Sequence, residues 1–444
     1  MDRNNIVTGF SKLDRREKLR LLFAGHIEKE KAIAEMESYR HHDQKVQKLH
    51  DEISENTITN YYLPYSVAPN FLINGKNYIL PLVTEESSVV AAMAKSAKFW
   101  STKGGFRTEI SEMIKNGQVH FIWNGSHDKM IDAFPDLKER LIKDTSEITA
   151  SMVNRGGGIV NIDLVDKREH IDGYYQLSAD FDTRDSMGAN FINSCLEQFA
   201  VTLEDFISHD DRFGSDEKNV EIIMSILSNY TDRCLVTASV SCSQEELGDF
   251  VDGLPSEKFI WKFTRAVKIA GVDKYRATTH NKGIFNGIDA VMIATGNDFR
   301  AVEAAGHAWA SRDGVYRSLS VAGEEDGRLS LRLTLPLPVG TVGGLTSLHP
   351  MAKRSLEILG NPDASELMGI IAAGGLAANF AAIRSLIAGG IQAGHMKMHL
   401  SNILNRLGAD EDERVSAAEY FNERKVGYAS VKAFLAELRK KKSF

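Results

Sequence analysis

The stretch TTHNKGIFNGIDAVMIATGNDFR, residues 278–300, gathers many polar side chains around one very apolar segment. Its asparagines and glycines are turn formers, so they predict that Lys282 lies in a tight turn rather than on a helix. The β-branched and apolar run at residues 288–294 is typical of a buried strand. A helical pattern follows, which predicts that Asp298 lies where the strand ends and the next helix begins.

Two interpretations of these polar residues are open. In the first, Lys282 is a solvated turn lysine and Asp298 caps the N-terminus of a helix. In the second, both side chains face a crevice at the end of a strand, where α/β and α+β proteins collect site residues. A lysine that is kept charged by a neighbouring aspartate can stabilise a developing oxyanion.

Residues 279–283 (THNKG), residues 294–298 (ATGND) and Arg300 closely resemble the lysine and aspartate motifs of 3-hydroxy-3-methylglutaryl-coenzyme A (HMG-CoA) reductases of bacterial class II. The resemblance extends over nearly the whole chain after about residue 50, in separated motifs that follow the order of the family. It implies that Lys282 and Asp298 are catalytic residues.

The resemblance also implies an α+β fold with three parts. Residues 1–107 and 223–391 are expected to form a large helix-rich domain for substrate binding and dimerisation. An inserted ferredoxin-like small domain, residues 108–222, is expected to bind the cofactor, and its strand-like segments alternate with a charged helix. Residues 392–444 have the charged, weakly apolar composition of a movable C-terminal helical flap.

Local signals predict further elements. Asn74 and Gly75, between two apolar runs, indicate a tight hairpin turn. Small apolar residues predict helices at residues 89–99 and 365–388, and residues 9–50 have the pattern of charged helices.

Length and composition limit the classes of function. A chain of 444 residues suggests two or three domains, and a net charge of −7 argues against a nucleic-acid binder. Cys195, Cys234 and Cys242 have no paired spacing, which argues against disulfides and structural zinc. The N-terminus lacks the apolar core of a signal peptide, and residues 367–383 fall short of a membrane span. We therefore expect a cytoplasmic protein with no membrane partner.

Residues 84–88 (TEESS) open a predicted helix. Acidic side chains at this place commonly interact with the positive end of a helix. A carboxylate at the end of an apolar strand can also have a raised pKa and donate a proton near neutral pH. The segment resembles the EEPS motif of class II reductases, with Ser87 in place of the usual proline. The resemblance implies that Glu86 is the catalytic acid and that Ser88 lies near a carboxylate of the substrate.

Residues 185–190 (DSMGAN) precede another predicted helix. A glycine at a helix start lets backbone amides approach a phosphate, although such a glycine is also common in plain turns. The segment is similar to the DAMGAN cofactor motif of the family, which implies cofactor contacts from Asp185, Met187, Gly188 and Asn190. No GxGxxG follows a strand, so an ordinary Rossmann domain is not expected.

The choice of nicotinamide cofactor depends on charge near the ribose. NAD-preferring members of the family have an aspartate shortly before the triple glycine, where this chain has Ile148 and Thr149. Arg140, Lys143 and Arg155 are near in sequence. We expect NADPH, with NADH as the alternative, and no metal.

The family also implies substrate contacts. Arg276 corresponds to an arginine that binds the free carboxylate of the substrate, a task that suits the planar guanidinium fork. Asn286 matches an asparagine on the substrate side. Asn229 matches one that contacts substrate or cofactor, although an isolated asparagine is equally typical of a turn.

His395 and His399 stand four residues apart, a spacing that suits a metal pair on a helix. No nearby glutamate motif or cysteine completes such a site. Gly-His-Met at residues 394–396 instead resembles the histidine motif at the hinge of the family's flap, which implies that His395 is catalytic.

Together these motifs predict a class II HMG-CoA reductase, which forms mevalonate and coenzyme A from HMG-CoA, or runs in reverse, through two hydride transfers. The family's active site lies between subunits, so a homodimer or a hexamer is expected. Two alternatives stay open. A reductase of another acyl-CoA would differ at the carboxylate-binding positions Arg276 and Ser88, and a non-catalytic CoA-binding protein would lack at least one catalytic residue.

Overall fold

The computed structural model describes residues 7–388, 400–422, 424 and 426–442. Two compact units make up the chain, Met1–Pro64 and Tyr65–Phe444. The second unit combines helices with several small sheets, so the chain is α+β, as predicted.

The first unit is helical, as expected from its charged pattern. It contains a 3-10 helix (Phe10–Lys12), α1 (Arg15–Leu22), α2 (Lys29–Ser38) and α3 (Gln44–Ile53). Arg40, between α2 and α3, pairs with Asp51 at 2.7 Å. Gln47 and Asn60 exchange two hydrogen bonds through their side-chain amides. These contacts tie α3 to the segments on either side of it.

The second unit begins with the predicted hairpin. β1 (Tyr65–Ile73) and β2 (Lys76–Val83) pair antiparallel. Asn74 and Gly75 form the turn with φ angles of 48° and 82°, because a primed two-residue turn needs left-handed backbone at both positions. The helix predicted after the hairpin is α4 (Val89–Ser101).

Lys282 lies in the middle of one continuous helix, α10 (Lys274–Ala294). The predicted turn around Lys282 and the predicted strand at residues 288–294 were therefore wrong. Asp298 precedes α11 (Phe299–Ala310), as expected, but it follows a helix and not a strand.

Burial on several sides explains this error. α10 packs against β2, α9 (Ser256–Val272), α11 and α14 (Ala364–Ala388). Its apolar residues therefore do not form a single stripe, and the helical period is hidden in the sequence. Tertiary packing overrides the local turn propensity of its asparagines and glycines.

α14 is the predicted small-residue helix, and most of its residues are buried. α10 and α14 approach each other closely where glycines of the two helices meet. A Cβ on Gly287 of α10 would lie 2.5 Å from the carbonyl oxygen of Gly374 of α14. By length and composition α14 could cross a membrane, but 67% of its most apolar stretch is buried inside the structure. This degree of burial is typical of a core helix.

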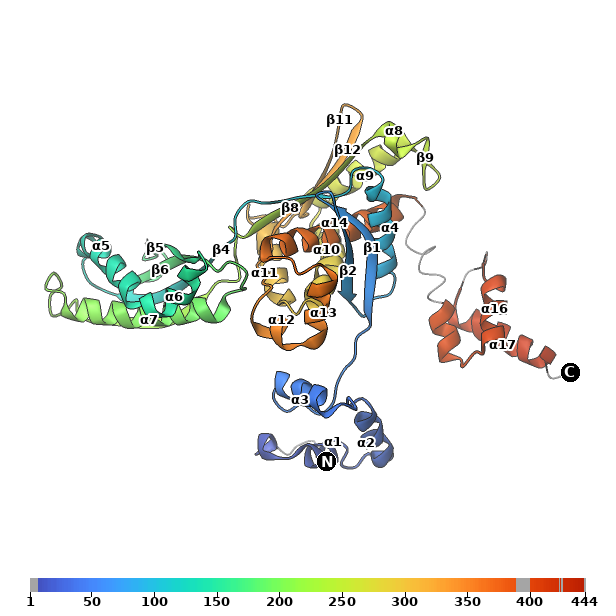
Figure 1. The fold of residues 1–444 in the computed structure, drawn as a ribbon, viewed down its shortest axis with the longest axis horizontal. Coiled ribbons are helices and arrows are strands. Elements are labelled where there is room, and N and C mark those ends of the chain that lie inside the picture. Colours follow the sequence, from blue (N-terminus) through green and yellow to red (C-terminus); the bar gives the residue numbers. More distant parts are fainter. Residues whose placement is uncertain (1–6, 389–399, 423, 425, 443–444) are drawn as a thin grey trace. The chain divides into compact units, whose positions relative to one another are not determined.

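A four-stranded antiparallel sheet covers α14 (Figure 1). Its order is β11-β12-β8-β3, with the bounds β11 (Ser320–Glu325), β12 (Arg328–Pro336), β8 (Leu235–Ser243) and β3 (Arg107–Ile110). Alternate residues of β12 and β8 are buried, because one face of the sheet packs on helices and the other does not.

A second four-stranded sheet has its own hydrophobic core. The chain runs through β4 (Ile114–Trp123), α5 (His127–Asp144), α6 (Ser146–Asn154), β5 (Gly158–Asp166), β6 (Tyr174–Asp182), α7 (Ala189–His209) and β7 (Val220–Leu227). The strand order is β5-β6-β4-β7, and all neighbours are antiparallel. The expected domain limits at residues 108 and 222 fall inside β3 and β7.

The described part of the second unit contains further elements. They are α8 (Gln244–Leu247), β9 (Phe250–Val251), β10 (Leu254–Pro255), α12 (Gly344–Leu348), α13 (Pro350–Ile358), α16 (Glu411–Tyr420) and α17 (Tyr428–Lys442). The C-terminal helices have a small core of their own, which includes Leu404, Ala417 and Val431. Residues 389–399, which include His395, lie outside the described part of the chain.

The close contact of α10 with α14 predicts that alanine substitutions at two glycines of α10 change the free energy of unfolding in opposite directions. Gly287→Ala should lower the free energy of unfolding by about 1–3 kcal/mol, because its Cβ meets a backbone oxygen that cannot move aside. Gly283→Ala on the same helix has only one atom near its Cβ, at 3.9 Å, and should raise stability by up to about 1 kcal/mol. Urea unfolding of both variants checks this, and equal effects would contradict the packing.

Candidate active site

Lys282 contacts Glu86 directly. Its Nζ donates a hydrogen bond to Oε2 of Glu86, which lies in the turn between β2 and α4. The backbone N–H of Glu86 donates to Thr84 Oγ1 at 3.1 Å, which helps to fix that turn. Both side chains remain accessible, with exposed fractions of 60% for Lys282 and 40% for Glu86. The structure thus brings together two of the residues predicted to be catalytic.

One face of α10 carries Lys282, Asn286 and Asp289, since positions i, i+4 and i+7 lie above one another on a helix. Asp289 is close to two other carboxylates, Glu303 of α11 and Glu85. Burial, and then these two acids, raise the pKa of Asp289 to about 8. Its Oδ1 is buried without a hydrogen-bond partner among the described residues. The helix that carries Lys282 therefore also holds an acid that keeps its proton near neutral pH.

A buried polar network anchors α10 next to Lys282. Nε2 of His280 lies 2.6 Å from Ser320 Oγ and 3.2 Å from Asn379 Nδ2. Ser320 also donates to Asn379 Oδ1 at 2.9 Å. Burial lowers the pKa of His280 to about 3, so its imidazole is neutral. Asn379 is a lone polar residue in the apolar α14, and this contrast was the only signal in the sequence for the network.

Asn281 connects α10 to the chain before β11. Its Nδ2 donates to Tyr316 Oη at 3.0 Å and to the carbonyl of Arg317 at 2.9 Å. Its Oδ1 accepts from the backbone N–H of Leu319 at 2.9 Å. The asparagine that suggested a turn is therefore a buried connector on a helix.

Asp298 caps α11, as one of the two interpretations predicted. Its Oδ1 accepts from the backbone N–H groups of Arg300 and Ala301 at 3.1 and 3.2 Å, and Oδ1 also lies 3.3 Å from Nε of Arg300. Asn297 fixes this turn, because its Oδ1 accepts from the Gly340 N–H at 2.8 Å. Among the described residues, no hydrogen bond or ion pair joins Asp298 to Lys282.

Asp185 ties the segment before α7 to two distant parts of the chain. Its backbone carbonyl accepts from the Thr341 N–H at 2.8 Å, and its Oδ1 accepts from the Ala364 N–H at the start of α14, also at 2.8 Å. The backbone at Gly340 lies very close to the backbone at Met187, because a Cβ on Gly340 would lie 2.5 Å from the amide nitrogen of Met187. The segment is therefore held rigidly.

Gly188 immediately precedes α7 and has a left-handed φ of 86°, and a Cβ there would lie 2.4 Å from Thr183 Cγ2. Only glycine fits this position. No side chain in the described part of the chain caps α7, which leaves its first backbone N–H groups available. Buried Lys115 donates to Thr183 Oγ1 at 2.6 Å and to the Ser186 carbonyl at 2.9 Å. An uncapped helix start beside a rigid glycine suits a phosphate group.

One cleft of about 770 Å³ joins the start of α7 to the start of α11. Met187, Gly188 and Asn190 line it together with Asp298. Asn229 and Met187 line a second, much smaller cavity. The structure thus gathers most residues of the predicted cofactor site around Met187, and it places one predicted catalytic aspartate in the same cleft.

α6 and the turn after it form another wall of the cleft. Ile148 and Arg155 line it, whereas Thr149 is buried. Arg140 does not line the cleft and forms ion pairs with Asp144 and Asp205. Of the three basic residues considered for the cofactor preference, Arg140, Lys143 and Arg155, only Arg155 lines this cleft.

The sequence and the fold match one known family. A model of the family described as hydroxymethylglutaryl-coenzyme A reductase matches residues 15–400. The chain belongs to this family. It is 35% identical to the HMG-CoA reductase of Archaeoglobus fulgidus, over 82% of this chain and 79% of that protein. It is also 35% identical to a probable HMG-CoA reductase of Borreliella burgdorferi, over 79% of this chain and 78% of that protein.

Solved structures of HMG-CoA reductases support the same conclusion. A class II HMG-CoA reductase of Streptococcus pneumoniae, bound to NADPH in open conformations, superimposes with a TM-score of 0.71. The two chains are 35% identical, and the match covers 96% of this chain and 100% of the other. The predicted resemblance to class II HMG-CoA reductases is confirmed, and the chain is an oxidoreductase of this family.

The remaining residues predicted from the HMG-CoA reductase family are placed as follows. Ser88 is the N-cap residue of α4 with a left-handed φ of 76°, and its side chain makes no capping hydrogen bond. Arg276 is half-buried near the start of α10, and burial lowers the pKa of its guanidinium. His395 lies outside the described residues. The carboxylates Asp289 and Glu303 were not singled out in the sequence, since isolated acids on helices carry no motif.

The raised pKa of Asp289 predicts a pH-dependent stability. The unfolded chain releases this proton near the ordinary value of 3.8, whereas the folded protein holds it up to about 8. The stabilisation by protonated Asp289 is therefore complete below the first value and is lost as the pH rises through the second. Asp289→Asn cannot ionise, so its stability relative to the parent should increase from about pH 5 to about pH 9. Urea unfolding at both pH values measures this, and a constant difference would contradict the raised pKa.

Proposed function

We propose that this protein is an HMG-CoA reductase that converts HMG-CoA to mevalonate and coenzyme A, or catalyses the reverse, with NADPH as the reductant. The contact between Lys282 and Glu86 carries this proposal. It joins two family motifs that are 196 positions apart in the sequence. Residues of the DSMGAN segment also line one cleft together with Asp298, which supports the proposal further.

Lys282 and Glu86 have complementary roles in the proposed reaction. Reduction of a thioester carbonyl builds negative charge on its oxygen, and the Lys282 ammonium stabilises that charge. The nicotinamide cofactor, when bound, supplies the hydride for each of the two reductions. Glu86 donates the proton that the oxygen needs as the aldehyde intermediate is reduced. The hydrogen bond between the two side chains holds the ammonium and the acid at the same carbonyl oxygen.

Asp298 and His395 complete the proposed set. By resemblance to the family, Asp298 contributes negative charge to the same catalytic set. His395, by resemblance to the family, protonates the departing coenzyme A thiolate. The C-terminal residues 392–444 close over the site as a flap, which keeps the aldehyde intermediate from escaping.

Three residues bind the substrate in this proposal. Arg276 pairs with its free carboxylate, for which a guanidinium fork is well shaped. Ser88 contributes a hydroxyl that no cap contact occupies. Asn286 stands one helical turn from Lys282 on the same face of α10, and this spacing supports a contact with the same substrate.

The cleft at α7 fits a nicotinamide dinucleotide. The close backbone approach at Gly188 and the uncapped N–H groups that follow it at the start of α7 receive the diphosphate. An acidic residue at the ribose would favour NADH. Arg155 and Ile148 line this part of the cleft instead, which supports NADPH. Asp185, Met187, Asn190 and Asn229 complete the proposed cofactor contacts. Among the described residues there is no group of three or more His, Cys, Asp or Glu side chains that could hold a metal ion, and the proposed chemistry is written without one.

The small sheet supports a ferredoxin-like cofactor domain. Its order along the chain, β4-α5-α6-β5-β6-α7-β7, follows the β-α-β-β-α-β pattern of that fold with one additional helix, and its strand order β5-β6-β4-β7 is consistent with it. We place its limits at residues 114–227, so that β3 stays with the large domain and all of β7 belongs to the small one. A homodimer or hexamer with active sites between subunits, in the cytoplasm, completes the proposal.

Lys282→Ala should abolish both reductions. Loss of the oxyanion partner is expected to lower kcat on the order of a hundredfold to a thousandfold or more, for HMG-CoA and for added mevaldehyde alike. NADPH oxidation, followed by its absorbance with purified protein, measures both reactions. Lys274→Ala removes an exposed lysine from the same helix and should leave both rates unchanged. Normal turnover by Lys282→Ala would exclude the proposed mechanism.

The same assay separates the two alternatives. A reductase of another acyl-CoA would oxidise NADPH with that thioester but not with HMG-CoA. A non-catalytic CoA-binding protein would bind HMG-CoA without oxidising NADPH or NADH. Formation of mevalonate with HMG-CoA and either cofactor would exclude both alternatives.

Arg155→Ala tests the cofactor preference. Loss of this guanidinium should raise the KM for NADPH about tenfold, because a charge-assisted contact to the 2′-phosphate disappears. The KM for NADH, which lacks that phosphate, should change little. Arg140→Ala is the matched control, since Arg140 does not line the cleft. Equal changes in both KM values would argue against a role in phosphate recognition.

A further inference from the structure

The outer face of the four-stranded sheet is polar where β12, β8 and β3 lie side by side. The leucines of β12 point into the core, so its arginines and Ser330 point outward. The register places Ser241 opposite Ser330, and it places Ser239 between Arg332 and Arg107. Neighbouring strands are about 4.8 Å apart, so long side chains from β12 and β3 can reach the same group over β8.

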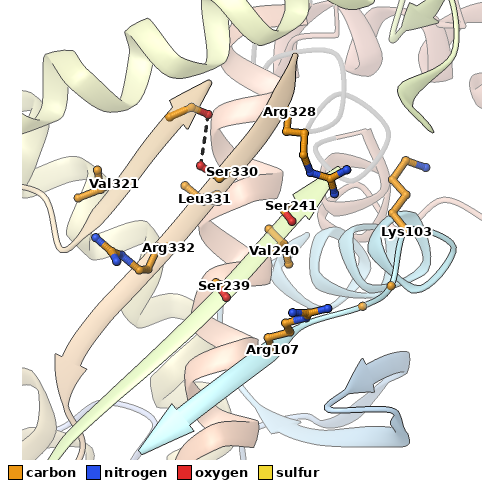
Figure 2. A pocket seen from close by; sticks show the side chains of 13 residues that line it. Lys103, Arg107, Ser239, Val240, Ser241, Val321, Arg328, Ser330, Leu331 and Arg332 are labelled. Atoms are coloured by element: carbon orange, nitrogen blue, oxygen red, sulfur yellow. Dashed lines mark hydrogen bonds between the residues drawn. The ribbon is translucent and has the colours of Figure 1, made fainter. Parts of the chain in front are cut away.

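These side chains and Lys103 line a pocket of about 460 Å³. Figure 2 shows the charged ends of Lys103, Arg107 and Arg328 on the side of the pocket near Ser241, whereas Arg332 extends toward β11. The three cations come from separate segments, the turn after α4, β3 and β12. We name the group of Lys103, Arg107, Arg328, Ser239 and Ser241 the cationic pocket.

The turn after α4 fixes the position of two of the cations. Gly104 and Gly105 both have left-handed backbone, with φ angles of 90° and 76°. A Cβ on Gly105 would lie 2.3 Å from the carbonyl oxygen of Leu72, so this position requires glycine. The Gly105 N–H donates to the Trp100 carbonyl at 2.9 Å. Lys103 and Arg107 therefore stand on a rigid backbone and not on a loose loop.

The charges of the cationic pocket are poorly balanced by carboxylates. Within the described part of the chain, Arg107 has no ion pair or hydrogen bond through its side chain. Arg328 reaches Glu246 only at 3.9 Å. Lys103 lies 4.3 Å from the centre of the Phe99 ring and contacts the Thr102 hydroxyl. Three neighbouring cations repel one another. The chain as a whole has a net charge of −7, so this cluster is not part of a generally basic surface.

We infer that the cationic pocket binds the phosphate groups of a small molecule. Two guanidinium forks and one ammonium match a multiply charged phosphate, and the hydroxyls of Ser239 and Ser241 can donate to its oxygens. The pocket volume is within the range of small-molecule sites. None of the residues proposed for catalysis or for the nicotinamide cofactor belongs to this pocket, so the inference goes beyond the proposed reaction.

Calorimetry with tripolyphosphate tests the inference. The parent protein should bind it, and the affinity should fall as NaCl is added at constant pH. The double variant Arg107→Gln with Arg328→Gln should bind at least about tenfold more weakly, since two charge-assisted contacts are lost. Arg265→Gln removes an exposed arginine of α9 that does not line the pocket, and it should bind like the parent.

A further variant covers the case in which the double variant does not fold. Lys103→Gln changes the turn and leaves the sheet intact, and it should also weaken binding about tenfold or more. Thermal unfolding of each variant separates loss of binding from loss of fold. Because calorimetry needs no turnover, its result does not depend on whether the protein reduces HMG-CoA.

A competition arm identifies the source of the phosphate. If saturating HMG-CoA displaces tripolyphosphate, the pocket receives the phosphates of the coenzyme A part of the substrate. If both bind together, the ligand is a separate phosphorylated metabolite. Absence of binding to the parent at millimolar tripolyphosphate overturns the inference. Equal binding by the parent and the Arg107→Gln, Arg328→Gln variant overturns it too. If the parent binds no phosphate and the variant differs from it only in oligomeric state, the inference is also overturned.

Discussion

The close packing of α10 against α14 is the constraint on which the rest of the site depends. Gly287 lies against the backbone of Gly374, so the two helices approach more closely than side chains would allow. This contact fixes the rotation of α10. That rotation turns His280 and Asn281 into the interior, where they bond to other segments, and it turns Lys282 outward to Glu86.

Electrostatics then give the outward face of α10 its chemical character. Lys282 is a cation beside an accessible acid, and Asp289 on the same face keeps its proton because burial and two neighbouring acids oppose its ionisation. A helix thus presents a positive charge, an amide and a neutral acid in one row. Such a row suits the proposed reaction, which must stabilise a negative oxygen and also deliver protons.

A second connection links this helix core to the cleft at α7. Asp185 accepts hydrogen bonds from Thr341 and from the start of α14, and the backbones around Gly340 and Met187 almost touch. The proposed cofactor segment is therefore anchored to the same helix that supports α10. Movements of the small sheet as a rigid body would have to break these backbone contacts, so we expect the start of α7 to stay with α14.

The sequence by itself determined the family, the hairpin at Asn74 and Gly75, and the glycine before α7, because these rest on short motifs and on backbone angles that few residues adopt. Tertiary structure decided that residues 274–294 form a helix, since burial on several sides hides the helical period. It also decided the partners of single polar residues. Lys282 meets Glu86, and Asp298 pairs with Arg300 at the start of α11. Contacts between residues far apart in the chain depend on packing that no local pattern records.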